Sequence, residues 1–159
     1  MTDQPADPTA TLVEPIPVSS QRRRDASRAK TAPDRAEVVA AARAERPPLE
    51  VARRIVELAE DKKAADIVLL DLAGRTTLAD YFVICSGGSE RQIAAIADGV
   101  IGTLRDEGVR PIGREGEAAS HWILVDFGSV IVHIFTPPER DYYELEKHWS
   151  EAKTILRVQ

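Results

Sequence analysis

The sequence predicts an α/β domain in which helices pack on a mixed sheet of about five strands. Apolar residues recur alternately at helical and at strand spacing, in the order α-β-β-α-β-β-β-α. A strand, a helix and a further strand in succession require at least one parallel strand pair. The chain has 159 residues, of which 43% are hydrophobic. This is enough for one packed core but too short for two full-sized domains.

Three segments predict the first helix and the first two strands. Residues 49–62 place apolar residues at helical spacing, with charged residues on the opposite face. Residues 66–72 form a short and nearly continuous apolar run, which is typical of a strand covered on both faces. Residues 80–86 are β-branched and aromatic, and they indicate the second strand.

A second helix is predicted after the Gly87-Gly88 pair. Ser89 is a favourable N-cap residue, and Gln92 lies at the third helical position, where it completes a capping box. The helix is expected to end at Gly108, which suits the left-handed position after a helix. A third strand, residues 109–112, contains a proline and is therefore expected at an edge or a strand end.

A tight hairpin is predicted around Gly128-Ser129, between strands at residues 122–127 and 130–135. A two-residue turn pairs Leu124 with His133 and thereby determines which side chains share a face. One face is wholly apolar and is expected in the core. Its members are Ile123, Val125, Phe127, Val130, Val132 and Ile134.

The opposite face of the hairpin mixes aromatic and polar side chains: Trp122, Leu124, Asp126, Ile131, His133 and Phe135. Burial of a carboxylate and an imidazole without partners is costly. The face is therefore predicted to be a partially exposed protein-binding patch, with Trp122 as its anchor. In the alternative arrangement the last helix covers this face, and Asp126 and His133 form hydrogen bonds within the fold.

A last helix is predicted from Glu139, after two prolines that end the sheet. Tyr142, Leu145 and Trp149 recur at helical spacing and are expected on its packed face. The domain is thus placed at residues 49–153.

The ends of the chain are predicted to be extensions of this domain. Residues 154–159 are expected to form a short tail, and residues 1–48 a disordered or loosely helical extension. The latter is rich in proline and has no aromatic residue, so it cannot bury enough apolar surface to offset the cost of ordering. Residues 35–46 favour a transient helix. The run Arg22-Arg23-Arg24 is interpreted as a solvated charge run, with RNA contact as the alternative.

Charge separates the extension from the domain. The first 46 residues hold 8 basic and 7 acidic residues, which leaves 13 basic and 19 acidic residues for the remaining 113. A domain with a net charge of −6 gains nothing from counterion release on nucleic acid. Little direct nucleic-acid contact is expected, and a basic protein is the better partner.

Composition excludes several classes of protein. No apolar run approaches the roughly 18–20 residues of a membrane span. The N-terminus lacks the basic start and apolar block of a secretory signal. The single cysteine, Cys85, cannot form an internal disulfide or a cysteine-based zinc cage. We therefore expect a cytoplasmic protein with no membrane contact, no metal and no cofactor.

The alternative hypothesis from the sequence is that the protein is an enzyme. The Gly87–Ser89 loop could hold a phosphate at a helix N-terminus, as in a nucleotide-binding or nucleotidyltransferase-like enzyme. That transfer chemistry needs paired carboxylates for two metal ions, and Asp98 is the only acid at a suitable distance after the loop. Cys85 is interpreted as a small buried hydrophobe. No catalytic residue is predicted.

Five stretches of the domain follow one another in a specific order and spacing: residues 63–71 (KAADIVLLD), 79–92 (ADYFVICSGGSERQ), Glu115-Gly116, 122–135 (WILVDFGSVIVHIF) and 140–149 (RDYYELEKHW). From Leu49 onward, the sequence thereby resembles the ribosomal silencing factor family, RsfS, also called Iojap. The resemblance covers nearly the whole domain and no part of the N-terminal extension.

The resemblance implies a nucleotidyltransferase-like topology that lacks the catalytic carboxylates. It also implies a function, which is binding to the large ribosomal subunit through ribosomal protein L-fourteen. The surface bound is the one that the small subunit would occupy, so subunit joining is blocked sterically and translation falls when nutrients are short. Whether the domain forms a homodimer is left open.

The motifs and the hairpin face together predict six partner-binding residues: Trp122, Asp126, Phe127, His133, Arg140 and Tyr143. All but His133, which comes from the hairpin face, are carried over from the family pattern, whose partner-contacting tryptophan falls on Trp122. Two positions depart from that pattern. Ser129 stands where an acidic turn residue is common, and His148 where leucine is common.

Overall fold

The computed structural model describes residues 34–38 and 46–159. In chain order, its elements are α4 (Pro48–Asp61), β1 (Ala65–Asp71), β2 (Tyr81–Ser86), α5 (Glu90–Asp106), β3 (Gly113–Glu115), the 3₁₀ helix η2 (Ala118–Ser120), β4 (Trp122–Asp126), β5 (Val130–Phe135), α6 (Pro137–Tyr143), α7 (Leu145–His148) and β6 (Lys153–Val158). The strands form one mixed sheet in the order β3-β4-β5-β2-β1-β6. The predicted α/β class is confirmed.

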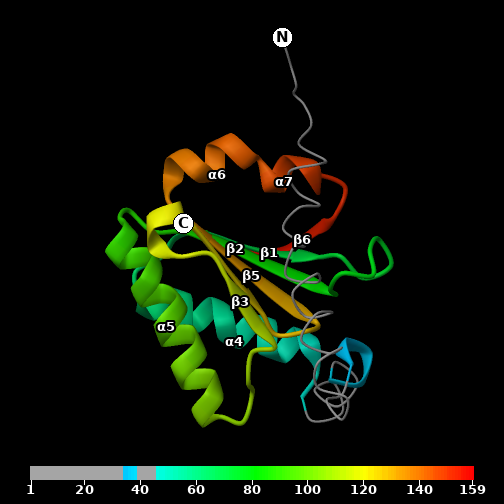
Figure 1. Cartoon of the computed structure of the whole chain (residues 1–159). Helices are drawn as coiled ribbons and strands as arrows, with labels where there is room; N and C mark the ends of the chain where they lie inside the picture. Colours follow the sequence, from blue (N-terminus) through cyan, green and yellow to red (C-terminus); the bar gives the residue numbers. More distant parts are fainter. Residues whose placement is uncertain (1–33, 39–45) are drawn as a thin grey trace.

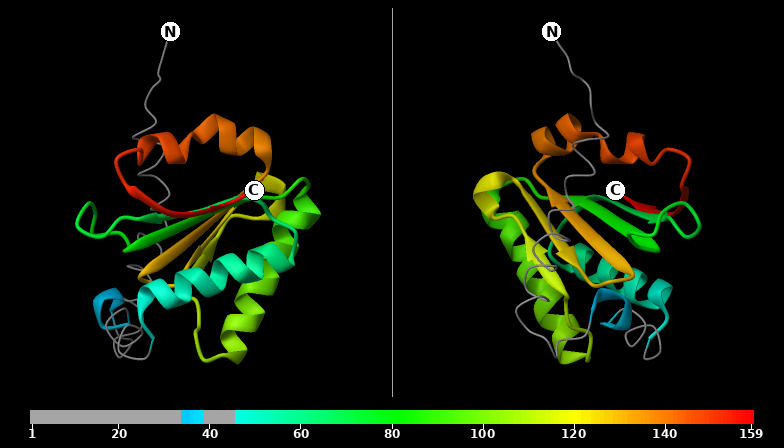
Figure 2. Two further views of the ribbon diagram at one scale, coloured as in Figure 1. Left: turned by 180° about the vertical axis from the view of Figure 1, so that it is seen from behind. Right: turned by 45° about the vertical axis from the view of Figure 1, so that its right-hand side comes forward.

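The sheet is the middle of three layers (Figure 1). The long helices α4 and α5 cover one face, and the short helices α6 and α7 cover the other; both views in Figure 2 agree. Two apolar clusters correspond to these two faces. No helix of residues 34–38 and 46–159 is long and apolar enough to cross a membrane.

The central pairing confirms the predicted parallel strands and the predicted hairpin register. Strand β2 runs parallel to β5, and β4 and β5 are antiparallel with Leu124 opposite His133. The amide of Phe127 donates to the carbonyl of Val130 at 2.9 Å, which closes the turn. Because a strand alternates its side chains, this register places the apolar face of the hairpin against α4 and α5.

The prediction of about five strands is wrong by one strand. Residues 154–159, expected to be a tail, belong for the most part to β6, which pairs antiparallel with β1. The third strand is also misplaced, since β3 covers Gly113–Glu115 rather than residues 109–112. Residues 108 and 109 instead complete the end of α5, where the amide of Val109 donates to the carbonyl of Leu104 at 2.8 Å.

The last helix is not continuous. Glu144 has a φ of 48°, and this left-handed residue separates α6 from α7. The turn of the chain removes Tyr142 from the predicted packed face, so its side chain is 76% exposed while Leu145 is buried. Trp149 is half-buried. Helical spacing counted across the break at Glu144 therefore does not identify one common packed face.

The N-terminal extension is described only in part. Residues 35–38 are helical, and residues 1–33 and 39–45, which include Arg22-Arg23-Arg24, lie outside the described residues. Pro48, which was placed at the end of the extension, is the first residue of α4. This agrees with the preference for proline in the first turn of a helix.

Candidate partner-binding site

An aromatic cluster lies where the hairpin meets α6. We define it as Trp122, His133, Phe135 and Tyr143. The Trp122 ring stacks on Phe135 with 4.9 Å between centroids and lies 4.6 Å from the ring of Tyr143. Trp122 and Tyr143 are half-buried, whereas Phe135 is buried. The cluster therefore has a buried base and a rim that reaches the surface.

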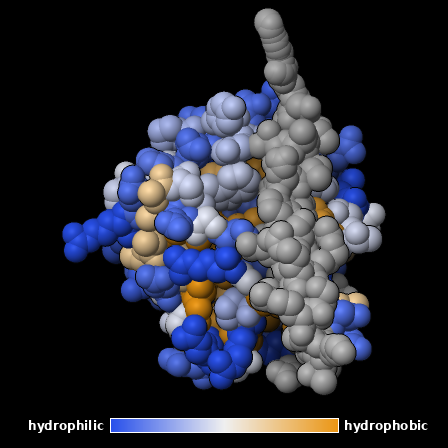
Figure 3. All heavy atoms as spheres, viewed as in Figure 1, coloured by the Kyte–Doolittle hydropathy of each residue, from blue (hydrophilic) through white to orange (hydrophobic). Residues whose placement is uncertain are grey.

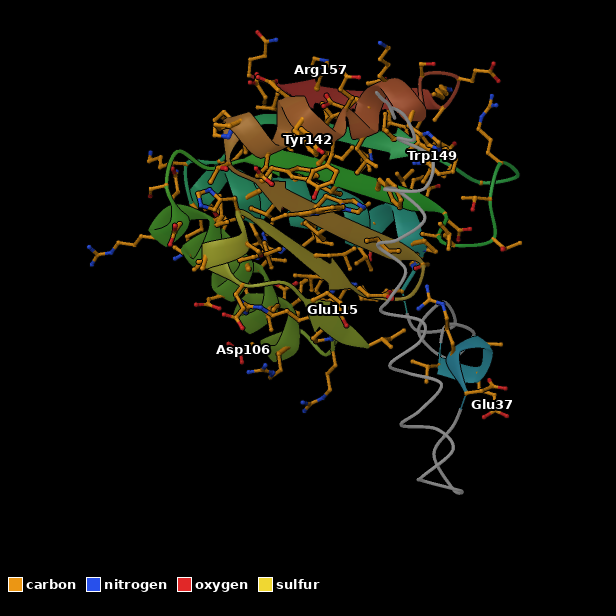
Figure 4. All side chains as sticks on the ribbon, turned by 45° about the horizontal axis from the view of Figure 1, so that its top comes forward. Glu37, Asp106, Glu115, Tyr142, Trp149 and Arg157 are labelled. Atoms are coloured by element: carbon orange, nitrogen blue, oxygen red, sulfur yellow. The ribbon has the colours of Figure 1, made fainter. Side chains whose placement is uncertain are left out.

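The exposed Tyr142 extends this rim. Its ring packs edge-on against Tyr143 at 5.0 Å between centroids. Figure 4 shows Tyr142 and Trp149 on the α6–α7 side of the sheet. Sequence reasoning placed Tyr142 in the core, because the break at Glu144 leaves no mark in the spacing of apolar residues.

His133 forms part of the buried base of the cluster. It is 2% exposed, and its Nδ1 accepts a hydrogen bond from Nε1 of Trp122 at 3.3 Å. Burial lowers the pKa of His133 from its ordinary 6.5 to about 3, so the ring is neutral near pH 7. The expectation that this face is open at His133 is wrong, since α6 and α7 cover it as in the alternative arrangement.

Asp126 is also buried, at 1% exposed, and its carboxylate is paired within the chain. Its Oδ1 accepts from the amide of Gly128 at 2.7 Å, and its Oδ2 accepts from the guanidinium of Arg35 at 2.8 Å. Arg35 belongs to the N-terminal extension and lies 91 positions away in sequence. No local pattern could have indicated this contact.

Phe127 lies on the core side of the sheet, as the hairpin register predicts. It is 3% exposed and packs in the cluster beneath α4 and α5. The side chain is therefore on the opposite face of the hairpin from Trp122 and does not contribute to the aromatic cluster.

Arg140 connects α6 to the sheet and to α7. Its Nε and Nη2 donate to the two carboxylate oxygens of Glu146, each at 2.9 Å, and its Nη1 donates to Oγ of Ser86 at 2.8 Å. A planar guanidinium suits this two-pronged arrangement. The role of Glu146 was missed by sequence reasoning, because the pair spans six residues across the helix break rather than three or four.

Gly116 positions the backbone at the start of β4. Its φ is 85°, and a β-carbon at this position would collide with the carbonyl oxygen of Trp122. A side chain is thus excluded both by the left-handed conformation and by lack of space. Glycine is therefore required at residue 116, where the backbone passes close to the carbonyl of Trp122.

Each residue of the Gly87–Ser89 loop makes a hydrogen bond within the domain. Ser89 caps α5 by accepting from the amide of Gln92 at 3.1 Å, as predicted. The return bond of the predicted capping box goes to a different donor, since Oε1 of Gln92 accepts from Gly88 at 2.7 Å. A phosphate would have to compete with Gln92 for that amide.

Cys85 is buried, and the structure also offers no group of side chains for a metal ion among its described residues. Burial raises the pKa of the Cys85 thiol to about 12, which opposes formation of a nucleophilic thiolate. Among residues 34–38 and 46–159, no group of three or more histidine, cysteine, aspartate or glutamate residues could hold a metal ion.

Fold and site together define a small α/β domain with an aromatic rim between its sheet and its C-terminal helices. The family model described as "Ribosomal silencing factor during starvation" matches residues 44–159. The chain therefore belongs to the ribosomal silencing factor family, which confirms the resemblance seen in the sequence.

Three similar proteins illustrate this relationship. The ribosomal silencing factor RsfS of Halalkalibacterium halodurans is 40% identical over 106 residues, covering 67% of this chain and 91% of that protein. A crystal structure of a Chromobacterium violaceum protein is 38% identical, with a TM-score of 0.62, and the match covers 64% and 85% of the two chains. The mouse protein named "Mitochondrial assembly of ribosomal large subunit protein 1" is 34% identical over 99 residues, 60% of this chain and 43% of that protein.

Proposed function

We propose that this protein binds the large ribosomal subunit in the cytoplasm through ribosomal protein L-fourteen. By occupying the surface that faces the small subunit, it blocks subunit joining and lowers translation when nutrients are short. The observation on which this rests is the family match, which spans the whole folded domain from α4 to β6.

The aromatic rim is the proposed point of contact. Large, rigid and half-buried aromatic side chains supply much of the energy of protein interfaces. Trp122 and Tyr143 have this character, and Tyr142 adds exposed apolar area beside them. On the face seen in Figure 3, apolar residues reach the surface in small separate areas between charged ones.

The remaining predicted site residues fit a positioning role better than direct contact. Phe127 and His133 are buried, and Arg140 holds α6 in place through Glu146 and Ser86. We assign His133 and Arg140 to the support of Trp122 and Tyr143, and Phe127 to the core beneath α4 and α5. Asp126 is buried but lies in the same strand as Trp122.

Charge supports a basic partner. Residues 47–159 carry a net charge of −6, and ribosomal proteins that bind RNA are rich in lysine and arginine. Opposite charges accelerate encounter at low ionic strength, and the effect is screened as the Debye length falls to about 8 Å at 0.15 M salt. The association rate with large subunits is therefore expected to decrease as salt increases.

Steric blocking requires surface rather than catalytic groups. We accordingly propose a non-enzymatic mechanism without a cofactor, on a sheet of nucleotidyltransferase-like topology that lacks the catalytic carboxylates. Magnesium–ATP should leave the melting temperature of the protein unchanged, because only a ligand that binds the folded state raises it.

Co-sedimentation on a sucrose gradient tests the proposal. The protein is mixed with separated large subunits, with separated small subunits, and with both under joining conditions. We expect it to migrate with large subunits alone and to reduce the fraction of joined ribosomes. Migration with small subunits, or retention at the top of the gradient, would contradict the proposed function.

A further inference from the structure

One arginine of the N-terminal extension is held by three acceptors of the folded domain. Nη1 of Arg35 donates to Oδ2 of Asp126 at 2.8 Å. Its Nη2 donates to the carbonyl oxygens of Leu78 at 2.8 Å and of Gly128 at 3.1 Å. We call these three acceptors the guanidinium notch. The contact joins residues separated by 43 to 93 positions, so it is a tertiary contact and not a feature of local sequence.

The notch is built by the domain itself. The amide of Gly128 donates to Oδ1 of Asp126, which directs the carboxylate toward the hairpin turn. The loop that contains Leu78 is attached to the same turn, because the amides of Asp80 and Tyr81 donate to the carbonyl of Ser129 at 2.8 and 3.1 Å. Two carbonyl oxygens and one carboxylate thereby converge at the turn end of the sheet.

These acceptors match an arginine rather than a lysine. A guanidinium presents several N–H groups in a fixed plane and can satisfy acceptors that lie on different sides of it. An ammonium is a compact point charge on a flexible stem, and it cannot reach the carboxylate and both carbonyls with the same geometry. The chemistry of the notch thus specifies the class of side chain that it binds.

The segment that carries Arg35 is ordered locally. Oδ1 of Asp34 accepts from the amide of Glu37 at 2.9 Å, and the carbonyl of Asp34 accepts from Val38 at 3.1 Å. Asp34 therefore acts as the N-cap of the helical turn at residues 35–38. Figure 4 shows this short helix, with Glu37 labelled, at the edge of the domain. Arg35 precedes residues 44–159, to which the family model matches.

Docked Arg35 engages one carboxylate oxygen of Asp126. With Arg35 in place Asp126 is only 1% exposed, although it lies in the same strand as the proposed anchor Trp122. A basic partner that uses this carboxylate must first displace Arg35.

We propose that the guanidinium notch is an arginine-binding site that the chain's own Arg35 occupies. The N-terminal extension is therefore an intramolecular competitor of an arginine of the basic ribosomal partner. This inference rests on the proposed function for its partner, but not for the docked state of Arg35.

Nuclear magnetic resonance of the full chain tests docking without a ribosome. The reporters are the amide of Gly128, which bonds to Asp126, and the guanidinium protons of Arg35. In the docked state these guanidinium protons exchange slowly with water. Arg35→Ala should shift the Gly128 resonance and remove the slowly exchanging protons, whereas Arg91→Ala, which removes an exposed arginine from α5, should do neither. An unchanged Gly128 resonance in Arg35→Ala would overturn the docking.

Binding to isolated large subunits tests the competition. If the docked form holds about nine-tenths of the molecules, the apparent Kd of the natural chain is about tenfold weaker than that of Arg35→Ala. Arg91→Ala should not tighten binding, because it removes the same charge without opening the notch. Arg35→Lys keeps the charge beside Asp126, so its apparent Kd should fall between those of the natural chain and Arg35→Ala. This conservative variant also controls for loss of folding in Arg35→Ala.

The outcomes separate the two proposals. Equal or weaker binding by folded Arg35→Ala, in a chain whose natural form does bind, would overturn the competition. If neither protein binds large subunits, the proposed function and the competition both fail, while the docked Arg35 is still decided by the resonances of the free chain.

Discussion

The indole Nε1 of Trp122 donates a hydrogen bond to Nδ1 of His133, at 3.3 Å. Because an indole N–H can only donate, Nδ1 is the acceptor, and the neutral imidazole carries its proton on Nε2. That Nε2 has no hydrogen-bond partner among the residues that the structure describes. The proposed anchor is thus joined to a buried histidine that can gain a second proton, on Nδ1, only by losing this hydrogen bond.

Acid should destabilise the domain through His133. Its pKa is about 3 in the folded protein and near 6.5 when unfolded, so below pH 6.5 the unfolded chain binds the extra proton first. The free energy of unfolding therefore falls with pH in the window between about 6.5 and 3. From pH 7 to pH 5 this one group should contribute a loss of about 2 kcal/mol.

Urea unfolding of the natural protein and of His133→Phe, at pH 7 and pH 5, measures this loss. Phenylalanine keeps an aromatic ring between Phe82 and Phe135 but cannot titrate. The variant should therefore lose less stability than the natural protein over the same interval, since other groups titrate in both. Equal losses would show that His133 is not neutral and buried in solution.

Trp122→Ala should weaken binding to the large subunit by about 2 kcal/mol, which is roughly 30-fold in Kd. The change removes the ring that packs between Phe135 and Tyr143 at the rim of the aromatic cluster. Trp122→Phe is the matched control, because it keeps a ring while losing the hydrogen bond to His133. Full binding by a folded Trp122→Ala protein would exclude the rim as the point of contact.

The hairpin was predictable from sequence and the part of the chain after Tyr143 was not, for physical reasons. A two-residue turn at Gly128-Ser129 leaves one pairing, so Leu124 opposite His133 follows from counting alone. The break at Glu144 comes from its left-handed backbone conformation, and a glutamate in the sequence gives no indication of that conformation. Strand β6 lies at the sheet edge and none of its six residues is buried. It therefore lacks the apolar run that reveals a central strand.

The candidate site shows the same division between local and distant information. Trp122 and His133 fall on one face by alternation along paired strands, and this was inferred correctly. Whether that face is covered depends on where α6 and α7 pack on the sheet. The alternation of side chains along a strand carries no information on this packing. The contact of Arg35 with Asp126 depends on a chain closure over 91 positions, for which a single sequence contains no periodic signal.

Arg140→Ala should lower the free energy of unfolding by about 3 kcal/mol, because it leaves the carboxylate of Glu146 without its two-pronged partner in a partly buried place. Glu146→Gln should cost less, since the amide still accepts a hydrogen bond. A double-mutant cycle by urea unfolding isolates the pair, and we expect a coupling energy of about 1–2 kcal/mol. A coupling near zero would mean that Arg140 acts through Ser86 alone.

Truncation after Ala152 should destabilise the domain by about 3 kcal/mol. Removal of an unstructured tail would leave the stability unchanged. The truncation removes β6, whose Leu156 and Val158 pair with β1 at Leu69 and Ile67 and pack against the core on the α4–α5 side. It also exposes the edge of β1, an apolar strand that then offers unpaired backbone groups to other molecules.

Deletion of Gln159 alone is the matched control, because this residue lies beyond β6. It should leave the urea midpoint and the solubility unchanged, whereas truncation after Ala152 should lower the midpoint and promote aggregation on concentration. If both deletions behave like the full chain, the sixth strand does not contribute to the folded domain. A loss confined to the longer truncation would establish that the C-terminal residues belong to the sheet, because only that change frees the β1 edge.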